Sequence, residues 1–221
     1  MSGKRLRDRI LRRARHVGLE LDKQQLDGLE LYYRELGRWS LKINLTAFQL
    51  TDDGTDDSVD RLLIEPLIAA KHIPAGAHSL VDIGSGGGSP AIPVKLARPE
   101  LSLTMVEVKV RKSAFLRQIA RQLKLERTVV ETSRFEELLS RPDLHEAADV
   151  VTVRAVRLDA STLSGLQAFL KPGGQLLSLT STNTPETPPL PLRVHTVHTL
   201  IPENQSWLVV MQKQRVGQRS T

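Results

Sequence analysis

Apolar residues along this chain follow two alternating patterns. Short apolar runs predict strands at residues 80–83, 101–106, 128–131, 149–153, 175–179, 194–200 and 207–211, and the runs at 80–83 and 149–153 indicate buried strands. Apolar residues at helical spacing predict helices at 92–97, 112–124 and 161–170. Because strands and helices alternate, we expect an α/β fold with a parallel sheet and right-handed crossovers, closed by the last two runs as an antiparallel edge pair.

The first 75 residues have a helical pattern instead. Apolar residues recur among the arginines of residues 1–17 and predict a basic amphipathic helix, the basic arm: Leu6, Ile10, Leu11, Ala14 and Val17. A second helix should follow Asp22 as its N-cap, and a third should run from a cap at Ser58 to residue 71, bent or interrupted by Pro66. We therefore expect an N-terminal helical extension (1–75), an α/β domain (76–213) and a basic tail (214–221).

Composition excludes several kinds of chemistry. The 221 residues contain no cysteine, which rules out disulfides, thiolate metal sites and cysteine nucleophiles. Only His195 and His198 approach a metal-ligand spacing, and on a strand they would point to opposite faces, so we predict no metal site. No apolar run reaches the roughly 20 residues that span a bilayer, so we expect no membrane contact and a cytoplasmic protein.

The net charge of +6 is concentrated at one end of the chain. Residues 1–15 hold seven basic residues against Asp8 alone and account for the whole excess. Such a basic arm predicts a polyanionic partner, most simply nucleic acid, although a solvated helix face explains it equally well. The acidic segment 51–57 predicts a loop in which repulsion and solvation suffice as an explanation.

The most informative stretch is LVDIGSGGGSPAIP at residues 80–93, where an apolar run with Asp82 near its end leads into a glycine-rich loop. Glycines let the backbone turn sharply and expose its N–H groups to a ligand. The spacing D-x-G-x-G-x-G differs from the dinucleotide fingerprint and favours S-adenosylmethionine over NAD. About 20 residues further on, Glu107 ends the next apolar run. In a nucleotide-binding α/β unit, a carboxylate at this place accepts hydrogen bonds from the ribose hydroxyls. The alternative is two surface turns with incidental acids.

Basic residues accompany the same predicted edge of the sheet. Arg154 follows the run 149–153 and would face the crevice of the glycine loop, or it forms an ion pair with one of the many acids. Arg111 and Lys112 start the helix after Glu107 and could bind phosphate, or form an ordinary solvated helix start.

Several of these motifs together resemble the RsmG (GidB) family of bacterial 16S ribosomal RNA guanine-N7 methyltransferases. The matching stretches are VDIGSGGGSPAIP, EVKVRKSAFLR, SRFEEL, VTVRAV, LKPGGQLLSL and the N-terminal YYRELGRWSLKINLTA. The resemblance implies a Rossmann-like class I methyltransferase sheet, mostly parallel, with seven strands, an antiparallel edge and an N-terminal helical extension. It further implies S-adenosylmethionine as cofactor and 16S ribosomal RNA or the small ribosomal subunit as partner of a monomeric protein.

The resemblance also implies roles for single residues. Arg154 would be the catalytic residue beside the target base, and the RNA-binding residues would be Arg111, Lys112 and Arg134. The cofactor would be bound by Asp82, Gly84, Ser85, Gly86, Gly88, Glu107, Phe135, Glu136 and Arg154. The chain departs from the family pattern at Leu62, Glu65, Pro66, Ser89, Ala91, Glu107 and Thr180-Ser181.

Methyl transfer to guanine N7 makes modest chemical demands. N7 carries a lone pair and no proton at neutral pH, so the reaction needs positioning and no general base. An arginine fork can reach guanine O6, and Arg154 is the candidate. The open alternatives are a paralogue that methylates another RNA or a small molecule, and a non-catalytic RNA-binding relative; a nicotinamide dehydrogenase is disfavoured by the loop spacing.

Overall fold

A computed structural model describes residues 2–183 and 187–215 and contains one seven-stranded sheet. The strands are β1 Ser79–Ile83, β2 Ser102–Val106, β3 Thr128–Glu131, β4 Ala148–Arg154, β5 Leu170–Thr180, β6 Leu192–Ile201 and β7 Ser206–Lys213. Their order is β3-β2-β1-β4-β5-β7-β6. The first five strands are parallel, and β7 runs antiparallel to both β5 and β6. The predicted sheet class and its antiparallel edge pair are confirmed.

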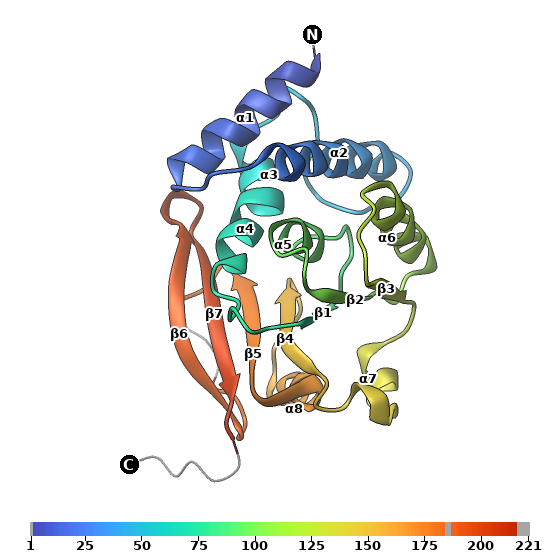
Figure 1. Ribbon diagram of the computed structural model, residues 1–221, viewed down its shortest axis with the longest axis vertical. Coiled ribbons are helices and arrows are strands. Elements are labelled where there is room, and N and C mark those ends of the chain that lie inside the picture. Colours follow the sequence, from blue (N-terminus) through green and yellow to red (C-terminus); the bar gives the residue numbers. More distant parts are fainter. Residues whose placement is uncertain (1, 184–186, 216–221) are drawn as a thin grey trace.

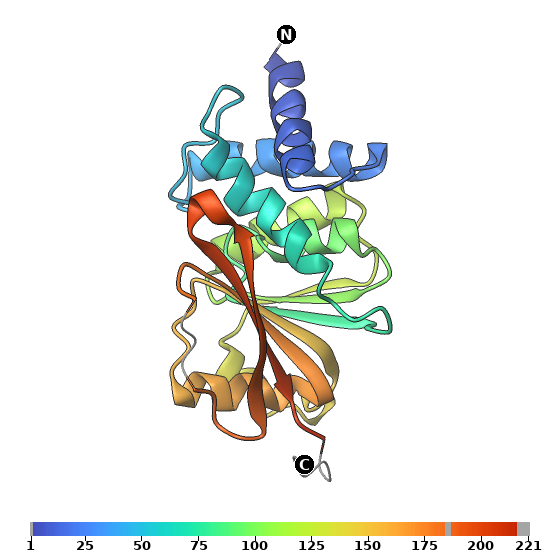
Figure 2. The same cartoon turned by 90° about the vertical axis from the view of Figure 1, so that its left-hand side faces the viewer.

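Helices cover both faces of the sheet, which gives three layers (Figures 1 and 2). One face carries α5 Ala91–Ala97 and α6 Val110–Gln122, and the other carries α7 Phe135–Leu138 and α8 Ala160–Phe169; short 3₁₀ turns lie at Pro142–Leu144 and Pro202–Asn204. Successive side chains of a strand point to opposite faces of the sheet, so neighbouring residues pack into the two different cores on those faces. Leu80 and Val150 belong to the core under α5 and α6, whereas Val81 and Val151 belong to the core over α8.

The N-terminal extension is stacked on the outside of α5 and α6 (Figure 1). It consists of α1 Ser2–His16, α2 Lys23–Ser40, α3 Asp56–Val59, a π-helix at Asp60–Ile64 and α4 Glu65–Ala70. Asp22 caps α2 as predicted, in a capping box with Gln25. The predicted cap at Ser58 is wrong: the helix begins at Asp56, and the buried Ser58 hydroxyl donates to the carbonyl oxygen of Thr55 at 3.1 Å.

The basic arm is a packed part of the molecule. Leu6, Ile10 and Ala14 of α1 are buried in the same core as the sheet residues beneath α5 and α6.

At the other end of the chain, Lys213 of β7 is buried as well, and its ammonium donates to Glu146 and two backbone carbonyls. Of the predicted basic tail, residues 216–221 lie outside the described residues.

Four arginines of the arm have counterions within the chain. Ion pairs join Arg5 to Asp53, Arg7 to Asp27 and Glu30, Arg12 to Asp56, and Arg13 to Asp60. Residues 51–55 form the predicted loop, and solvation is not the only influence on its charges, because Asp53 and Asp56 pair with α1 and Asp52 pairs with Arg34 of α2. These pairs leave the net charge of +6 unchanged, so contact of the arm with a polyanion stays a prediction.

Candidate functional site

The glycine loop after β1 is fixed to the neighbouring strand by its backbone. The N–H groups of Gly84 and Ser85 both donate to the carbonyl oxygen of Val106, at 2.9 and 3.0 Å. Gly86 follows with a φ of +51°, a conformation that side chains disfavour, and its N–H points to Glu107. The loop therefore presents bare backbone at the carboxyl edge of the parallel strands.

Glu107 lies against this loop, as the sequence predicted. Its Oε2 accepts the N–H of Gly86 at 2.9 Å, and its Oε1 accepts the N–H of Lys109 at 2.8 Å. The side chain is largely buried, yet it lines the cavity described below. Each carboxylate oxygen keeps a lone pair that a ligand hydroxyl can use. A distant Glu107 would have refuted the predicted nucleoside site, and the structure instead joins the two parts.

Asp82 has a different place, beneath the loop and outside the cavity lining. Its Oδ1 accepts the hydroxyl of Thr152 at 2.6 Å, and its Oδ2 has no hydrogen-bond partner within the described residues. Burial raises the pKa of Asp82 to about 6, because the ionised carboxylate loses its hydration. The residue therefore supports the loop from below, and its predicted contact with the cofactor stays a prediction.

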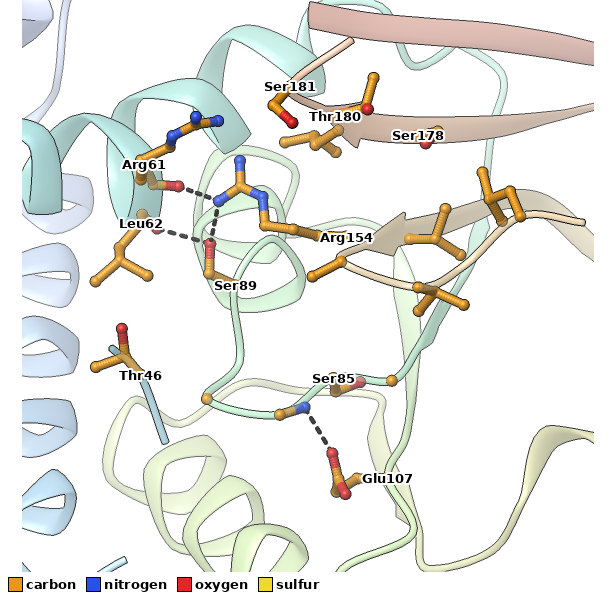
Figure 3. A pocket seen from close by; sticks show the side chains of 18 of the residues that line it. Thr46, Arg61, Leu62, Ser85, Ser89, Glu107, Arg154, Ser178, Thr180 and Ser181 are labelled. Atoms are coloured by element: carbon orange, nitrogen blue, oxygen red, sulfur yellow. Dashed lines mark hydrogen bonds between the residues drawn. The ribbon is translucent and has the colours of Figure 1, made fainter. Parts of the chain in front are cut away.

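A cavity of about 770 Å³ opens beside the loop and Glu107 (Figure 3). Segments from other parts of the chain complete its wall: Leu45, Thr46 and Phe48 after α2, the π-helix with Arg61 and Leu62, the end of β4 with Arg154, residues 178–182 at and just beyond the end of β5, Leu158 and Leu163 at α8, and Val209 and Met211 of β7. These segments are distant in sequence, and the sheet edge brings them together. The cavity therefore extends from a nucleoside-type cradle to a wall of guanidinium and hydroxyl groups.

Arg154 is held firmly in that wall. Its Nη2 donates to Oε2 of the buried Glu65 at 2.7 Å, and its Nη1 donates to Ser89 Oγ at 3.2 Å and to the carbonyl oxygen of Arg61. Burial lowers the pKa of Arg154 and raises the pKa of Glu65. The alternative of an ion pair for Arg154 is confirmed, and the residue also lines the cavity.

Pro66 explains why two helix carbonyls, those of Arg61 and Leu62, are free to accept hydrogen bonds from Arg154 and Ser89. Proline has no N–H, so the carbonyl of Leu62 loses its regular partner four residues later, and the carbonyl of Arg61 loses its π-helical partner five residues later. The N–H of Glu65 donates instead to Asp60. The hydroxyl of Ser89 donates to Leu62 at 3.0 Å, and Arg154 donates to Arg61.

Several predicted site residues lie away from the cavity. Gly88 packs inward, where a Cβ would lie 2.5 Å from Ile92 Cδ1. The ring of Phe135 lies against Gly165 of α8, and the side chain of Glu136 is exposed, with its Oε2 3.9 Å from Nε of Arg134. Arg111 is exposed at the start of α6. Arg134 is exposed and lies outside the lining too, and the predicted residues that do line the cavity are Gly84, Ser85, Gly86, Glu107, Lys112 and Arg154.

Sequence reasoning missed other parts of the wall. Arg61 and Thr46 were not singled out as site residues, and Ser89 was noted only as a departure from the family pattern. Thr180 and Ser181 were noted only as departures from a family pattern. One available signal was Pro66, because a proline within a helix predicts carbonyl groups that need outside donors.

The residues present fit a nucleoside cofactor. Gly86 borders open space, since a Cβ placed there would meet nothing closer than the Gly84 carbonyl oxygen at 3.6 Å. Glu107 stands at the same place with free acceptor capacity. Over residues 2–183 and 187–215, no group of three or more His, Asp or Glu side chains could hold a metal ion, and no helix is long and apolar enough to cross a membrane.

Solved structures share this fold at low sequence identity. A SAM-dependent methyltransferase from Aquifex aeolicus aligns with a TM-score of 0.53 and 14% identity over 71% of this chain and 92% of its own. The mitomycin 7-O-methyltransferase MmcR aligns with a TM-score of 0.56 and 17% identity over 86% of this chain and 70% of its own. These comparisons confirm the predicted methyltransferase fold.

Sequence relatives identify the family. Proteins named ribosomal RNA small subunit methyltransferase G are 40% identical over 67% of this chain in Roseiflexus sp. and 37% identical over 76% in Halorhodospira halophila. The matches span 62% and 75% of those relatives' own lengths. The family model described as GidB, rRNA small subunit methyltransferase G, matches residues 25–188. The predicted resemblance is thereby confirmed: this chain belongs to the GidB family of S-adenosylmethionine-dependent methyltransferases.

Proposed function

We propose that this protein transfers a methyl group from S-adenosylmethionine to N7 of a guanine in 16S ribosomal RNA. The observation that carries the proposal is the continuous cavity that joins the glycine loop and Glu107 to the wall formed by Arg61, Ser89 and Arg154. One end suits a nucleoside cofactor and the other suits a polar base. Membership of the GidB family supports the ribosomal substrate.

The division of labour within the cavity follows from its groups. Glu107 and the backbone of Gly84 to Gly86 would hold the ribose and the methionine part of the cofactor, which supplies an electrophilic methyl group. Guanine N7 needs no deprotonation, so the protein has to align the lone pair and exclude competing water. Among the described residues that line the cavity, the only carboxylate is Glu107, which suits a reaction without a general base.

The surroundings of the site complete the proposal. Residues 1–75 would cover one side of the cavity as an extension of the methyltransferase domain formed by residues 76–213. The protein would act as a monomer in the cytoplasm, where small ribosomal subunits are found. Light scattering of the purified protein, alone and with subunits, measures the oligomeric state.

The decisive experiment uses small ribosomal subunits from cells that lack this gene. The purified protein and S-adenosylmethionine carrying a labelled methyl group should add one label to 16S RNA, recovered as 7-methylguanosine by mass spectrometry after nuclease digestion. Label on another RNA or on a small molecule would favour a paralogue with a different substrate. Failure to bind the cofactor in calorimetry would favour the non-catalytic relative and refute the enzyme.

A further inference from the structure

Two guanidinium groups lie at the polar wall of the cavity, and they are held very differently (Figure 3). Arg154 has a carboxylate partner at 2.7 Å and two further acceptors. Arg61 has only long contacts, from Nη1 to Glu65 Oε1 at 3.6 Å and from Nη2 to the carbonyl oxygen of Asn204 at 3.4 Å. The guanidinium of Arg61 is therefore the one that can change partners when a ligand enters.

Charge at this wall also favours an acceptor ligand. Arg61 and Arg154 share one carboxylate, Glu65, which is almost completely buried. Its Oε2 is committed to Arg154, and its Oε1 has no hydrogen-bond partner among the described residues. One positive charge consequently remains incompletely paired beside the cavity, where partial burial strengthens its attraction for an acceptor.

The backbone of Arg61 is fixed even though its side chain is loosely held. Pro66 leaves the Arg61 carbonyl without a helical partner, and Arg154 binds that carbonyl directly. Ser89 holds the next carbonyl, at Leu62, and also contacts Arg154. Arg154 thus positions the turn that presents Arg61 to the cavity.

Resting on the proposed function, we propose that Arg61 recognises the target guanine by donating a hydrogen bond to its O6, while Arg154 is a positioning residue. Guanine offers two acceptors on this edge, O6 and N7, and the N7 lone pair is the one that forms the new bond to carbon. O6 is then the acceptor left for a guanidinium. This assignment moves base recognition from Arg154, the sequence-based candidate, to its neighbour.

The chemistry predicts an unusual kinetic signature for Arg61. In the transfer, the bond from sulfur to methyl carbon breaks as the bond from N7 to that carbon forms, and the positive charge moves from sulfur to the guanine ring. A cationic donor at O6 therefore helps bind the neutral base and gains nothing as the ring becomes cationic. Substituting Arg61 should raise KM for the subunit more than it lowers kcat, because the contact does not strengthen in the transition state.

The test is a cycle of two enzymes and two substrates. Small subunits are reconstituted with 16S RNA that carries either guanine or 6-thioguanine at the modified position, which replaces only O6 by a weaker acceptor. The wild-type protein should lose at least about tenfold in kcat/KM on the sulfur substrate, whereas Arg61→Gln should be slow on both and discriminate little between them. Arg61→Lys keeps the charge but lacks the forked guanidinium. Its KM should lie between those of Arg61→Gln and the wild type, and it should discriminate less than the wild type between the two substrates.

Controls separate this inference from its competitors. Arg15→Gln, on the exposed side of α1, should have the kcat/KM of the wild type on both the guanine and the 6-thioguanine substrate. Calorimetry should show that Arg61→Gln keeps the wild-type affinity for S-adenosylmethionine. Equal discrimination by wild type and Arg61→Gln would overturn the contact with O6, and a lost cofactor affinity would assign Arg61 to the cofactor carboxylate instead. If wild-type protein fails on unmodified guanine subunits, the proposed function fails and the inference fails with it.

Discussion

The ion pair between Arg13 and Asp60 predicts how strongly the basic arm stabilises the fold. Arg13 Nε and Nη2 donate to the two carboxylate oxygens of Asp60 at 2.8 and 2.7 Å, and Asp60 is 1% exposed. The hydrogen bonds to Asp60 raise the pKa of Arg13, as expected for a charge that is held by its partner. Replacing Arg13 by methionine keeps the apolar stem and leaves Asp60 as a buried carboxylate without its counterion.

Removing one partner of a buried ion pair costs about 3–5 kcal/mol, because the remaining charge is left desolvated. Asp60 would keep one hydrogen bond, from Asn204 Nδ2 to Oδ2 at 3.0 Å, so the lower end applies. We expect Arg13→Met to lower the free energy of unfolding by about 3 kcal/mol. For a chain of this size the melting temperature should fall by roughly 6–12 °C.

Urea unfolding followed by circular dichroism measures this loss, with Arg15→Met on the same helix as the matched control because that side chain is exposed. The double variant Arg13→Met with Asp60→Asn should recover much of the loss, since no unpaired charge remains. If Arg13→Met stays within about 0.5 kcal/mol of the control, the pair contributes no more than a surface ion pair and the reasoning is refuted.

Three further substitutions test the site and its supports. Gly86→Asp should abolish calorimetric binding of S-adenosylmethionine while Gly76→Asp, at a glycine with open space around it, leaves binding intact; wild-type affinity in the first variant would contradict the cradle. Burial raises the pKa of Asp82 from 3.8 to about 6, so its stabilising contribution is full below about pH 4 and is lost as the pH rises through 6. This loss in the free energy of unfolding amounts to roughly 3 kcal/mol at pH 7. Urea unfolding measured across this pH range should show the loss in the wild type and not in Asp82→Asn. Gly88→Ala should cost about 1–3 kcal/mol in the same assay, because its φ is +92° and the new methyl would meet Ile92 Cδ1 at 2.5 Å; an unchanged midpoint would place the need for glycine elsewhere.

Local sequence patterns predicted the sheet because its strands contain short apolar runs, which are buried almost throughout in β1, β4 and β7 and only partly buried in β3 and β6. The run at 128–131 coincides with β3, and the glycine loop with Glu107 was found because both follow a strand directly. In a parallel sheet those strand ends share one edge, so topology alone brings them together. The half of the cavity beside the glycine loop was therefore predictable.

The polar half of the cavity was not, because its geometry depends on contacts between distant segments. Arg61 and Ser89 meet Arg154 only after the extension has docked on the sheet. Charge counting has the same limit: a sum over residues 1–15 shows an excess, but it does not show that Asp53 and Asp56 lie across from that helix. The sum therefore could not tell which arginines of the arm have counterions within the fold.

The arm and the cavity are linked through the π-helix, which gives the arm a role besides stability. Arg13 of α1 binds Asp60, Asp60 accepts a hydrogen bond from Asn204, and the carbonyl oxygen of Asn204 accepts one from Arg61 at the cavity wall. Because Asp60 directly precedes Arg61, loss of the Arg13 contact loosens the turn that presents Arg61. Arg13→Met should therefore raise KM for small subunits while the affinity for S-adenosylmethionine stays unchanged, since Gly86 and Glu107 hold each other without the arm. If Arg13→Met has the same KM as Arg15→Met, the turn at Arg61 keeps its geometry without the Arg13 contact, and the arm does not influence the cavity.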